Sequence, residues 1–217
     1  TVDASEIETQ FLPQGLVPDA VNPALKAPRI VRQYKRLGDL EYDERLDATI
    51  AGYWSATVEA PRVLAEQNRA WRAPGGEDVN WIQPWSAAFI SWAIESAGVP
   101  RDLFCPDARH TIYVERLVER ARRPGAVLIP HPVGKRAPQV GDVICATREG
   151  GTTTLQNLNR GPGHCDIVVE VRPGEVHAIG GNVGDSVTRS VFPLDASGFL
   201  SPISARPFFT VIENRQP

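Results

Sequence analysis

Several residue types that often define a protein class are scarce or missing in this sequence. Its 217 residues include no methionine, three cysteines and four histidines. Three cysteines allow at most one internal disulfide, which excludes a small scaffold held together by disulfides. No CxxC pair and no close cluster of Cys and His occurs, so we predict no metal site.

Charge of one sign and long apolar runs are also missing. The net charge is −3 and the pI about 5.8, which gives no reason to expect nucleic acid or an anionic membrane surface as a partner. No apolar run approaches the ~20 residues that a membrane span requires. Hydrophobic residues make up 42% and charged residues 23%, the balance of a soluble globular protein.

The first 37 residues differ from the rest of the chain. They carry prolines at positions 13, 18, 23 and 28 and show little periodicity. We interpret residues 1–37 as an extended arm, either a plain linker or a segment that wraps the domain. Residues 38–217 have the length of one domain.

Three segments in the first half of the chain predict helices. Residues 42–73 place apolar side chains at spacings of three and four. Residues 86–97 follow, with Gly98 as a C-terminal stop. The apolar stripe of this second segment, which we expect to be buried, consists of Phe89, Trp92, Ala93 and Ala97. Residues 105–123 predict a further helix with Pro106 in its first turn.

Short runs rich in Val and Ile follow Gly125 and predict strands. They are AVLIP, GDVICAT, CDIVVEV, EVHAIGG, SVTRSVFPL and FFTVIEN. Helices followed by strands predict an α+β domain. We expect the N-terminal helices to pack on a five- or six-stranded antiparallel, barrel-like sheet.

Three polar residues stand at the ends of these elements. Ser86 opens a helix, His164 opens a strand, and Asn182 follows the next strand. A nucleophile at a helix N-terminus lies beside backbone N–H groups that have no intrahelical partner and can stabilise an oxyanion. Such a nucleophile needs an adjacent base, and the base needs a group that holds its ring. The alternatives are ordinary: a helix cap, a structural histidine and a turn asparagine.

The order of these motifs resembles a known superfamily. A helix with the nucleophile, then GDV, then GH opening an apolar strand, then GN after the following strand, is similar to the papain-like cell-wall amidases and peptidases. These include CHAP domains and NlpC-type peptidases, and the similar region covers about residues 80–192. WSAAFISWAIESAG and HTIY also resemble a bacterial branch of this superfamily defined only as a domain of unknown function.

The resemblance implies roles for individual residues. Ser86 matches the nucleophile, His164 the base and Asn182 the orienting residue, with His177 as a rival for the third role. We expect the substrate to contact Gln83, Trp85, His110, Tyr113 and Asp166. For Gln83 the expected role is to polarise a carbonyl, and for His110 and Tyr113 core packing is the alternative.

The sequence departs from the superfamily at two positions. Gly180 stands where many CHAP domains have a glutamate, and Ser86 stands where they have a cysteine. A serine hydroxyl ionises far less readily than a thiol, so it needs a true general base. Three explanations are open: a working serine nucleophile, a site that binds without cleaving, and a Cys→Ser change made to trap an inactive enzyme.

The implied function is hydrolysis of peptide or amide bonds without a metal or organic cofactor. The implied substrate is peptidoglycan or another peptide, and the implied location is periplasmic or secreted in a bacterium. An export signal removed by processing, or trimming of the sequence, would account for the missing initiator methionine. The alternatives are a catalytically silent domain that binds peptidoglycan or peptide and a structural adaptor; the oligomeric state is not predicted.

The cysteines have a simpler interpretation. Cys145 and Cys165 lie in neighbouring predicted strands among apolar residues, which favours buried thiols, or a cross-strand disulfide if the chain is exported. Cys105, which precedes Pro106, is the cysteine with the most plausible reactive setting.

Overall fold

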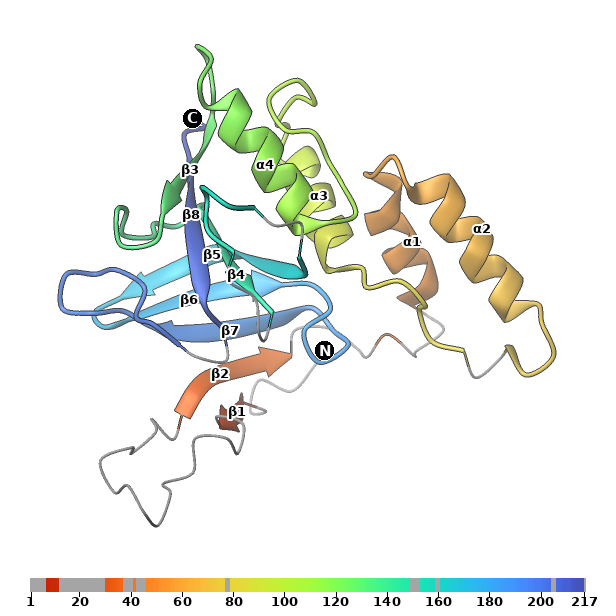
Figure 1. Cartoon of the computed structure of the whole chain (residues 1–217). Helices are drawn as coiled ribbons and strands as arrows, with labels where there is room; N and C mark the ends of the chain where they lie inside the picture. The colour runs from red at the N-terminus through yellow and green to blue at the C-terminus, as the bar shows by residue number, and fades with distance from the viewer. Residues whose placement is uncertain are drawn as a thin grey trace.

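The structure is a computed structural model that describes residues 7–11, 30–36, 41, 46–76, 79–148, 153–158, 161–203 and 206–216, the first two ranges as backbone only. The helices are α1 (Asp47–Ser55), α2 (Ala60–Trp71), α3 (Ser86–Ser96) and α4 (His110–Arg120). The strands are β1 (Ile7–Phe11), β2 (Ile30–Arg36), β3 (Leu128–Pro132), β4 (Val143–Thr147), β5 (Gly163–Arg172), β6 (Glu175–Gly180), β7 (Thr188–Pro193) and β8 (Phe208–Asn214). The predicted α+β class is confirmed (Figure 1).

All six predicted strands are present, and they belong to one antiparallel sheet. Its strand order is β1-β2-β7-β6-β5-β4-β8-β3. Two further strands, β1 and β2, lie within the predicted N-terminal arm, and β2 pairs with β7. The prolines of the arm, at 13, 18, 23 and 28, lie outside the described residues.

The predicted barrel-like closure is wrong. No ladder among the described strands joins the two ends of the order, so the sheet is open. At one end, β3 has the sequence LIPHP, and Pro130 and Pro132 carry no N–H to donate to another neighbour. Proline is accepted at a sheet edge for this reason, and β3 pairs with β8 alone among the described strands.

The helical half of the chain differs from the predicted pattern in two places. The segment 42–73 contains two helices, because Pro61 lies in the first turn of α2, a position where its missing N–H costs nothing. The helix predicted from residue 105 begins only at His110, and Arg109 is its N-cap in an extended conformation. Pro106 therefore lies before α4 and not in its first turn.

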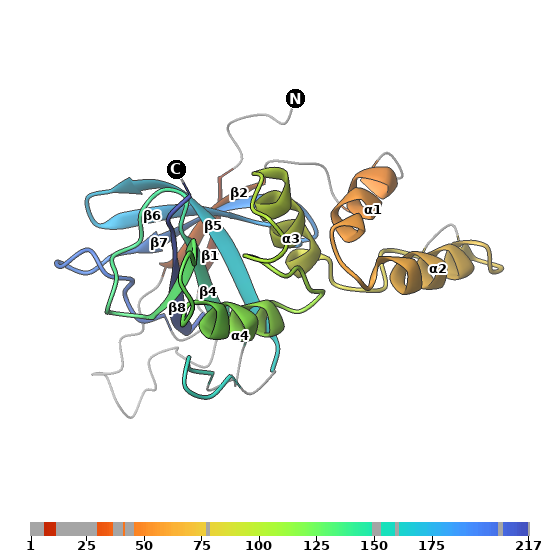
Figure 2. The same ribbon diagram turned by 90° about the horizontal axis from the view of Figure 1, so that it is seen from above.

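Helix α3 lies between α1 and the sheet (Figure 2). Its buried face is made of small and apolar residues: Ser86, Ala87, Ala88, Phe89, Ile90, Ser91 and Ile94. The predicted stripe is wrong in part, because Trp92 is 39% exposed and Ala97 is exposed too, although Phe89 is buried. A helix that is apolar on most sides does not reveal its buried face by periodicity. Gly98, with φ +84°, ends α3 as predicted.

Two hydrophobic clusters cover the two faces of the sheet. The first joins the four helices to β4 and β5 and includes Trp54, Phe89 and Tyr113. The second lies on the opposite face around Phe192 and Val211. The first cluster fixes the N-terminal ends of α3 and α4 against the start of β5, where the candidate site lies.

Candidate functional site

Ser86 is the first residue of α3, and Trp85 is its N-cap without a side-chain cap bond. The first hydrogen bond of this turn runs from the N–H of Phe89 to the carbonyl of Trp85. The N–H groups of Ser86, Ala87 and Ala88 lie ahead of it and have no partner within the helix. The buried hydroxyl of Ser86 therefore lies beside N–H groups whose hydrogen bonds can stabilise a developing negative charge.

His110 is the hydrogen-bond partner of this hydroxyl. It is the first residue of α4, and its Nε2 lies 2.8 Å from Ser86 Oγ. The other ring nitrogen, Nδ1, lies 2.6 Å from the hydroxyl of Tyr113, one turn further along α4. Ser86, His110 and Tyr113 thus form one buried chain of hydrogen bonds between two helix N-termini.

Burial keeps these groups neutral. It lowers the pKa of His110 well below 6.5, and the neighbouring His164 and Arg148 lower it further. It also raises the pKa of Tyr113 well above 10. A neutral imidazole has one donor and one acceptor nitrogen. His110 accepts the Ser86 proton in the tautomer whose Nδ1–H donates to the Tyr113 oxygen.

His164, the predicted base, opens β5 beside this chain. Its ring centroid lies 5.3 Å from that of His110. Its Nε2 is hydrogen-bonded to Asp166 Oδ1 at 3.0 Å, and Asp166 Oδ2 accepts a bond from Arg206 at 2.9 Å. Burial lowers the pKa of His164 to about 4, so this ring is also neutral at pH 7. No hydrogen bond joins Ser86 to His164 in the described part of the chain.

The third predicted residue, Asn182, does not hold the His164 ring in this structure. Asn182 lies in the turn after β6 with φ 55°, the left-handed conformation that asparagine tolerates. Asp166 occupies the orienting position instead. Gly180 makes room for it, because a Cβ at Gly180 would overlap Asp166 Oδ1 and lie 2.9 Å from His164 Nε2.

A cleft of about 530 Å³ opens over Ser86 and His110. Its walls come from the end of α1 and the start of α2, from Gln83, Pro84 and Ser86, from the start of α4, from the residue after β4, and from the start of β5 and the segment before it. The charged lining residues are Glu59, Arg62, Arg109 and Arg148. Sequence reasoning missed all four, since no local motif marks charges that only the fold brings together.

The remaining predicted substrate residues are distributed between cleft and core. Gln83 lines the cleft, and its Nε2 donates to Glu66 at 3.3 Å. Trp85 is buried in the core, where it donates from Nε1 to Glu41 at 2.7 Å and stacks on Tyr53. Tyr113 and Asp166 do not line the cleft. Tyr113 is hydrogen-bonded to His110, and Asp166 is hydrogen-bonded to His164.

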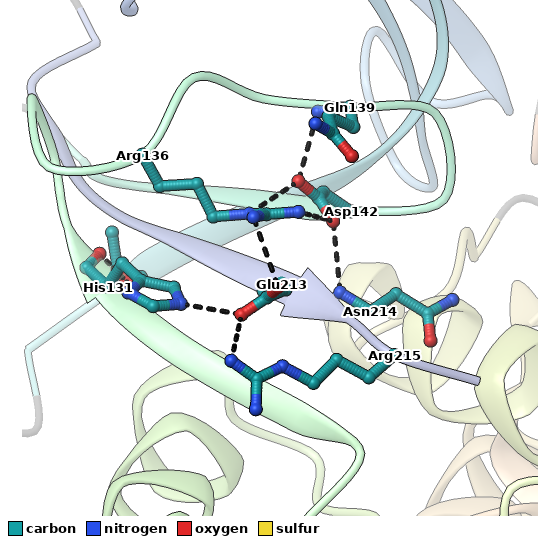
Figure 3. Close-up of polar contacts among 8 residues, drawn as sticks. His131, Arg136, Gln139, Asp142, Glu213, Asn214 and Arg215 are labelled. Atoms are coloured by element: carbon teal, nitrogen blue, oxygen red, sulfur yellow. Dashed lines mark hydrogen bonds and ion pairs between the residues drawn. The ribbon is translucent and has the colours of Figure 1, made fainter.

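The aspartate of the GDV motif has a structural role. Asp142 is buried and pairs with Arg136 through both carboxylate oxygens, at 3.0 and 3.2 Å. It also accepts hydrogen bonds from the backbone N–H groups of Gln139 and Asn214. Figure 3 shows this cluster extending through Glu213 to its other partners, His131 and Arg215. It joins the segment before β4 to the end of β8.

Two further observations concern cysteine and metal chemistry. Cys145 and Cys165 are directly opposite on β4 and β5 and form a disulfide, whereas Cys105 is exposed and free. Within the described ranges, no three or more His, Cys, Asp or Glu side chains gather as metal ligands. None of the described helices has the length and apolar character needed to cross a membrane.

Comparison with known proteins gives one family and no individual relative. Residues 42–213 match the model of the family described as "Uncharacterized protein conserved in bacteria (DUF2272)". No curated protein and no solved structure matches the chain. The match covers both helices that meet at Ser86 and His110 and the six strands β3–β8, except the last residue of β8. The chain therefore belongs to the bacterial DUF2272 family.

Proposed function

We propose that this protein hydrolyses a peptide or amide bond, with Ser86 as nucleophile and His110 as its general base. The observation that carries this proposal is the 2.8 Å contact between Ser86 Oγ and His110 Nε2 at the wall of an open cleft. A nucleophile, a base within hydrogen-bond reach and a third group on the base form the arrangement that acyl transfer requires. Tyr113 supplies the third group.

The steps follow from these positions. Ser86 Oγ attacks the carbonyl carbon of the substrate while His110 Nε2 takes its proton. The oxyanion lies toward the first-turn N–H groups of α3. The imidazolium then protonates the leaving amine, the C–N bond breaks, and an acyl ester remains on Ser86. Water attacks this ester with His110 again as base, which releases a carboxylic acid and restores the serine.

This assignment differs from the predicted one in the choice of base. His164 was expected to take the Ser86 proton, but its Nε2 is hydrogen-bonded to Asp166. We assign His164 and Asp166 a positioning role, since the two imidazole rings lie 5.3 Å apart. Replacing His110 should therefore abolish activity, and replacing His164 should reduce it less.

A papain-like fold and a cell-wall substrate belong to the same proposal. The support is the order of elements: a helix that starts at the nucleophile packs on an antiparallel sheet, with GD just before β4, GH at the start of β5 and GN just after β6. The Cys145–Cys165 disulfide supports export, because disulfides persist mainly in oxidising compartments. Peptidoglycan is accordingly the first substrate to test.

The second candidate is a domain that binds peptide in the same cleft without cleaving it. The missing Ser86–His164 hydrogen bond favours it, because the predicted triad is not assembled.

A fluorophosphonate probe separates the two without knowledge of the substrate. It reacts with serines that a base activates. We expect one adduct on Ser86 in the unchanged protein and in the Arg69→Gln control, an exposed site on α2 that does not line the cleft. Ser86→Ala should give none, and His110→Ala at least about a hundredfold slower labelling. Equal labelling of His110→Ala and unchanged protein would contradict the proposed base.

Release of soluble fragments from purified peptidoglycan then tests the substrate. We expect release by the unchanged protein and none by Ser86→Ala. Activity confined to Ser86→Cys would show that serine has replaced a working cysteine. If Ser86 is labelled but no fragments are released, peptidoglycan is rejected as the substrate and the proposal of a hydrolase stands.

A further inference from the structure

Three arginines and one glutamate line the cleft: Arg62, Arg109, Arg148 and Glu59. Arg62 and Arg109 line it but are engaged in ion pairs, with Glu66 at 3.2 Å and with Asp107 at 3.8 Å. Arg148 follows β4, is exposed, and has no ion pair in the described part of the chain. Its guanidinium is therefore available to an anion that enters the cleft.

The charge of Arg148 acts on the reacting histidine. Burial is the main reason that the pKa of His110 is low; His164, Arg148 and Arg206 lower it further, and Asp166 raises it. During attack by Ser86, His110 becomes an imidazolium ion, so a nearby guanidinium opposes the reaction. A substrate carboxylate paired with Arg148 would remove this cost, and the same group would be favoured by the partial positive charge at the N-termini of α3 and α4.

The opposite wall presents two buried polar atoms without partners. Glu59 Oε2 and Trp54 Nε1 are both buried, and neither has a hydrogen-bond partner within the described residues. Both side chains line the cleft, from the end of α1 and the turn before α2. Buried polar groups in folded proteins are nearly always paired. Glu59 as a whole is only partly buried and lines the cleft, so a carboxylate with an unpaired oxygen lies where a ligand can supply a donor.

These two walls lie on opposite sides of the nucleophile. Helix α3 packs against α1 on one side and against β5 on the other (Figures 1 and 2). Glu59 belongs to the α1–α2 side, as does Arg62, whose charge is paired with Glu66, and Arg148 belongs to the sheet side. A ligand that extends across Ser86 would therefore meet a negative group at one end and a positive group at the other.

We propose that the cleft binds a short zwitterionic peptide, with an ammonium group at Glu59 and a carboxylate at Arg148. A neutral glycan chain would satisfy neither group. This inference rests on the proposed function for the location of the scissile bond, since the peptide lies across Ser86. The charge recognition itself can be measured without any cleavage.

The experiment measures binding to the Ser86→Ala protein by calorimetry. The probes are tetra-alanine with free ends, its N-acetylated form, its C-amidated form and the doubly capped form. Charged hydrogen bonds of this kind carry about a ten- to hundredfold change in affinity. We expect each cap to weaken binding by at least about tenfold, and the doubly capped peptide to bind least.

Charge-removing variants assign each end. In the Ser86→Ala background, Arg148→Gln should cancel the effect of C-amidation and leave that of N-acetylation. Glu59→Gln should do the reverse. Arg69→Gln and Glu119→Gln remove exposed charges away from the cleft and should change neither. Equal affinity for all four peptides, or no binding of any, would overturn the inference, whereas a failure of fluorophosphonate labelling alone would overturn only the hydrolase.

Discussion

Ser86 and His110 each occupy the first residue of a helix, and this shared position determines their chemistry. The helix N-terminus favours negative charge at the serine and disfavours positive charge at the histidine. Burial acts in the same direction on the histidine. The pair is thus a neutral imidazole and a hydroxyl, which is suited to general-base catalysis and not to a preformed ion pair.

The pH dependence of serine labelling tests this state of His110. The base must be neutral, and its pKa lies well below 6.5, so the reactive form persists as the pH falls past the value for an ordinary histidine. We expect the fluorophosphonate rate to stay level from pH 8 to below pH 6.5. Arg148→Gln should move the acid limb to higher pH, because removing a positive charge raises the pKa of His110. An acid limb centred at or above pH 6.5 in the unchanged protein would contradict the buried neutral base.

Gly180 tests the position of Asp166. A Cβ there would overlap Asp166 Oδ1 and crowd His164 Nε2. We expect Gly180→Ala to lower the free energy of unfolding by about 1–3 kcal/mol, as for other overpacked sites. The control is Gly52→Ala in α1, where a Cβ meets nothing within 4 Å and should raise stability by up to about 1 kcal/mol. Urea denaturation measures the stability of both variants. Equal stability of Gly180→Ala and the unchanged protein would show that Asp166 and His164 on β5 do not pack tightly against Gly180 on β6.

Helices and strands show which sequence signals are local. The six strands β3–β8 were predicted because Val-rich runs bounded by Gly and Pro identify strands at short range. The start of α4 at His110 was not predicted, since Pro106 alone satisfies the local rule for a helix N-terminus. The exposed side of α3 was not predicted either, because it depends on where α1 and the sheet lie.

The segment before β4 is held by the buried carboxylate of Asp142, which pairs with the partly buried Arg136. The Asp142 carboxylate accepts hydrogen bonds from the guanidinium of Arg136 and from the backbone N–H groups of Gln139 and Asn214 (Figure 3). We expect Asp142→Ala to cost about 3–5 kcal/mol in urea denaturation, because it leaves these donors without their acceptor. The exposed pair of Arg101 and Glu95 is the control, and Glu95→Gln should cost less than about 1 kcal/mol. Similar losses in the two variants would show that Asp142 does not organise the fold.

At the scale of the whole molecule, a disulfide joins the adjacent strands β4 and β5. Cys145 and Cys165 close a segment of 20 residues, for which chain entropy predicts about 3 kcal/mol. We expect a reductant to lower the denaturation midpoint of the unchanged protein. A protein with both cysteines replaced by alanine should have the lower midpoint with or without reductant, and Cys105→Ser should behave like the unchanged protein. An unchanged midpoint after both thiols become titratable would show that the bond adds no stability.

The open sheet illustrates a limit of sequence reasoning at this scale. Strands in the second half of the chain were predicted correctly, but the predicted barrel-like closure is wrong, since closure depends on whether two distant edges meet. The prolines of β3 contain the relevant signal, because an edge without N–H donors cannot join a barrel. That signal becomes interpretable only when β3 is known to be the last strand of the order.

By itself the sequence determined the α+β class, the strands, the helix that begins at Ser86 and the presence of His164 and Asn182 near strand ends. These follow from local periodicity and from residues that start or end elements. The tertiary structure decided which histidine meets Ser86. His110 and Ser86 are 24 residues apart, and their contact depends on how α3 and α4 pack on the first core cluster. It also decided that Asp166 rather than Asn182 holds His164, because the space at Gly180 exists only between paired strands.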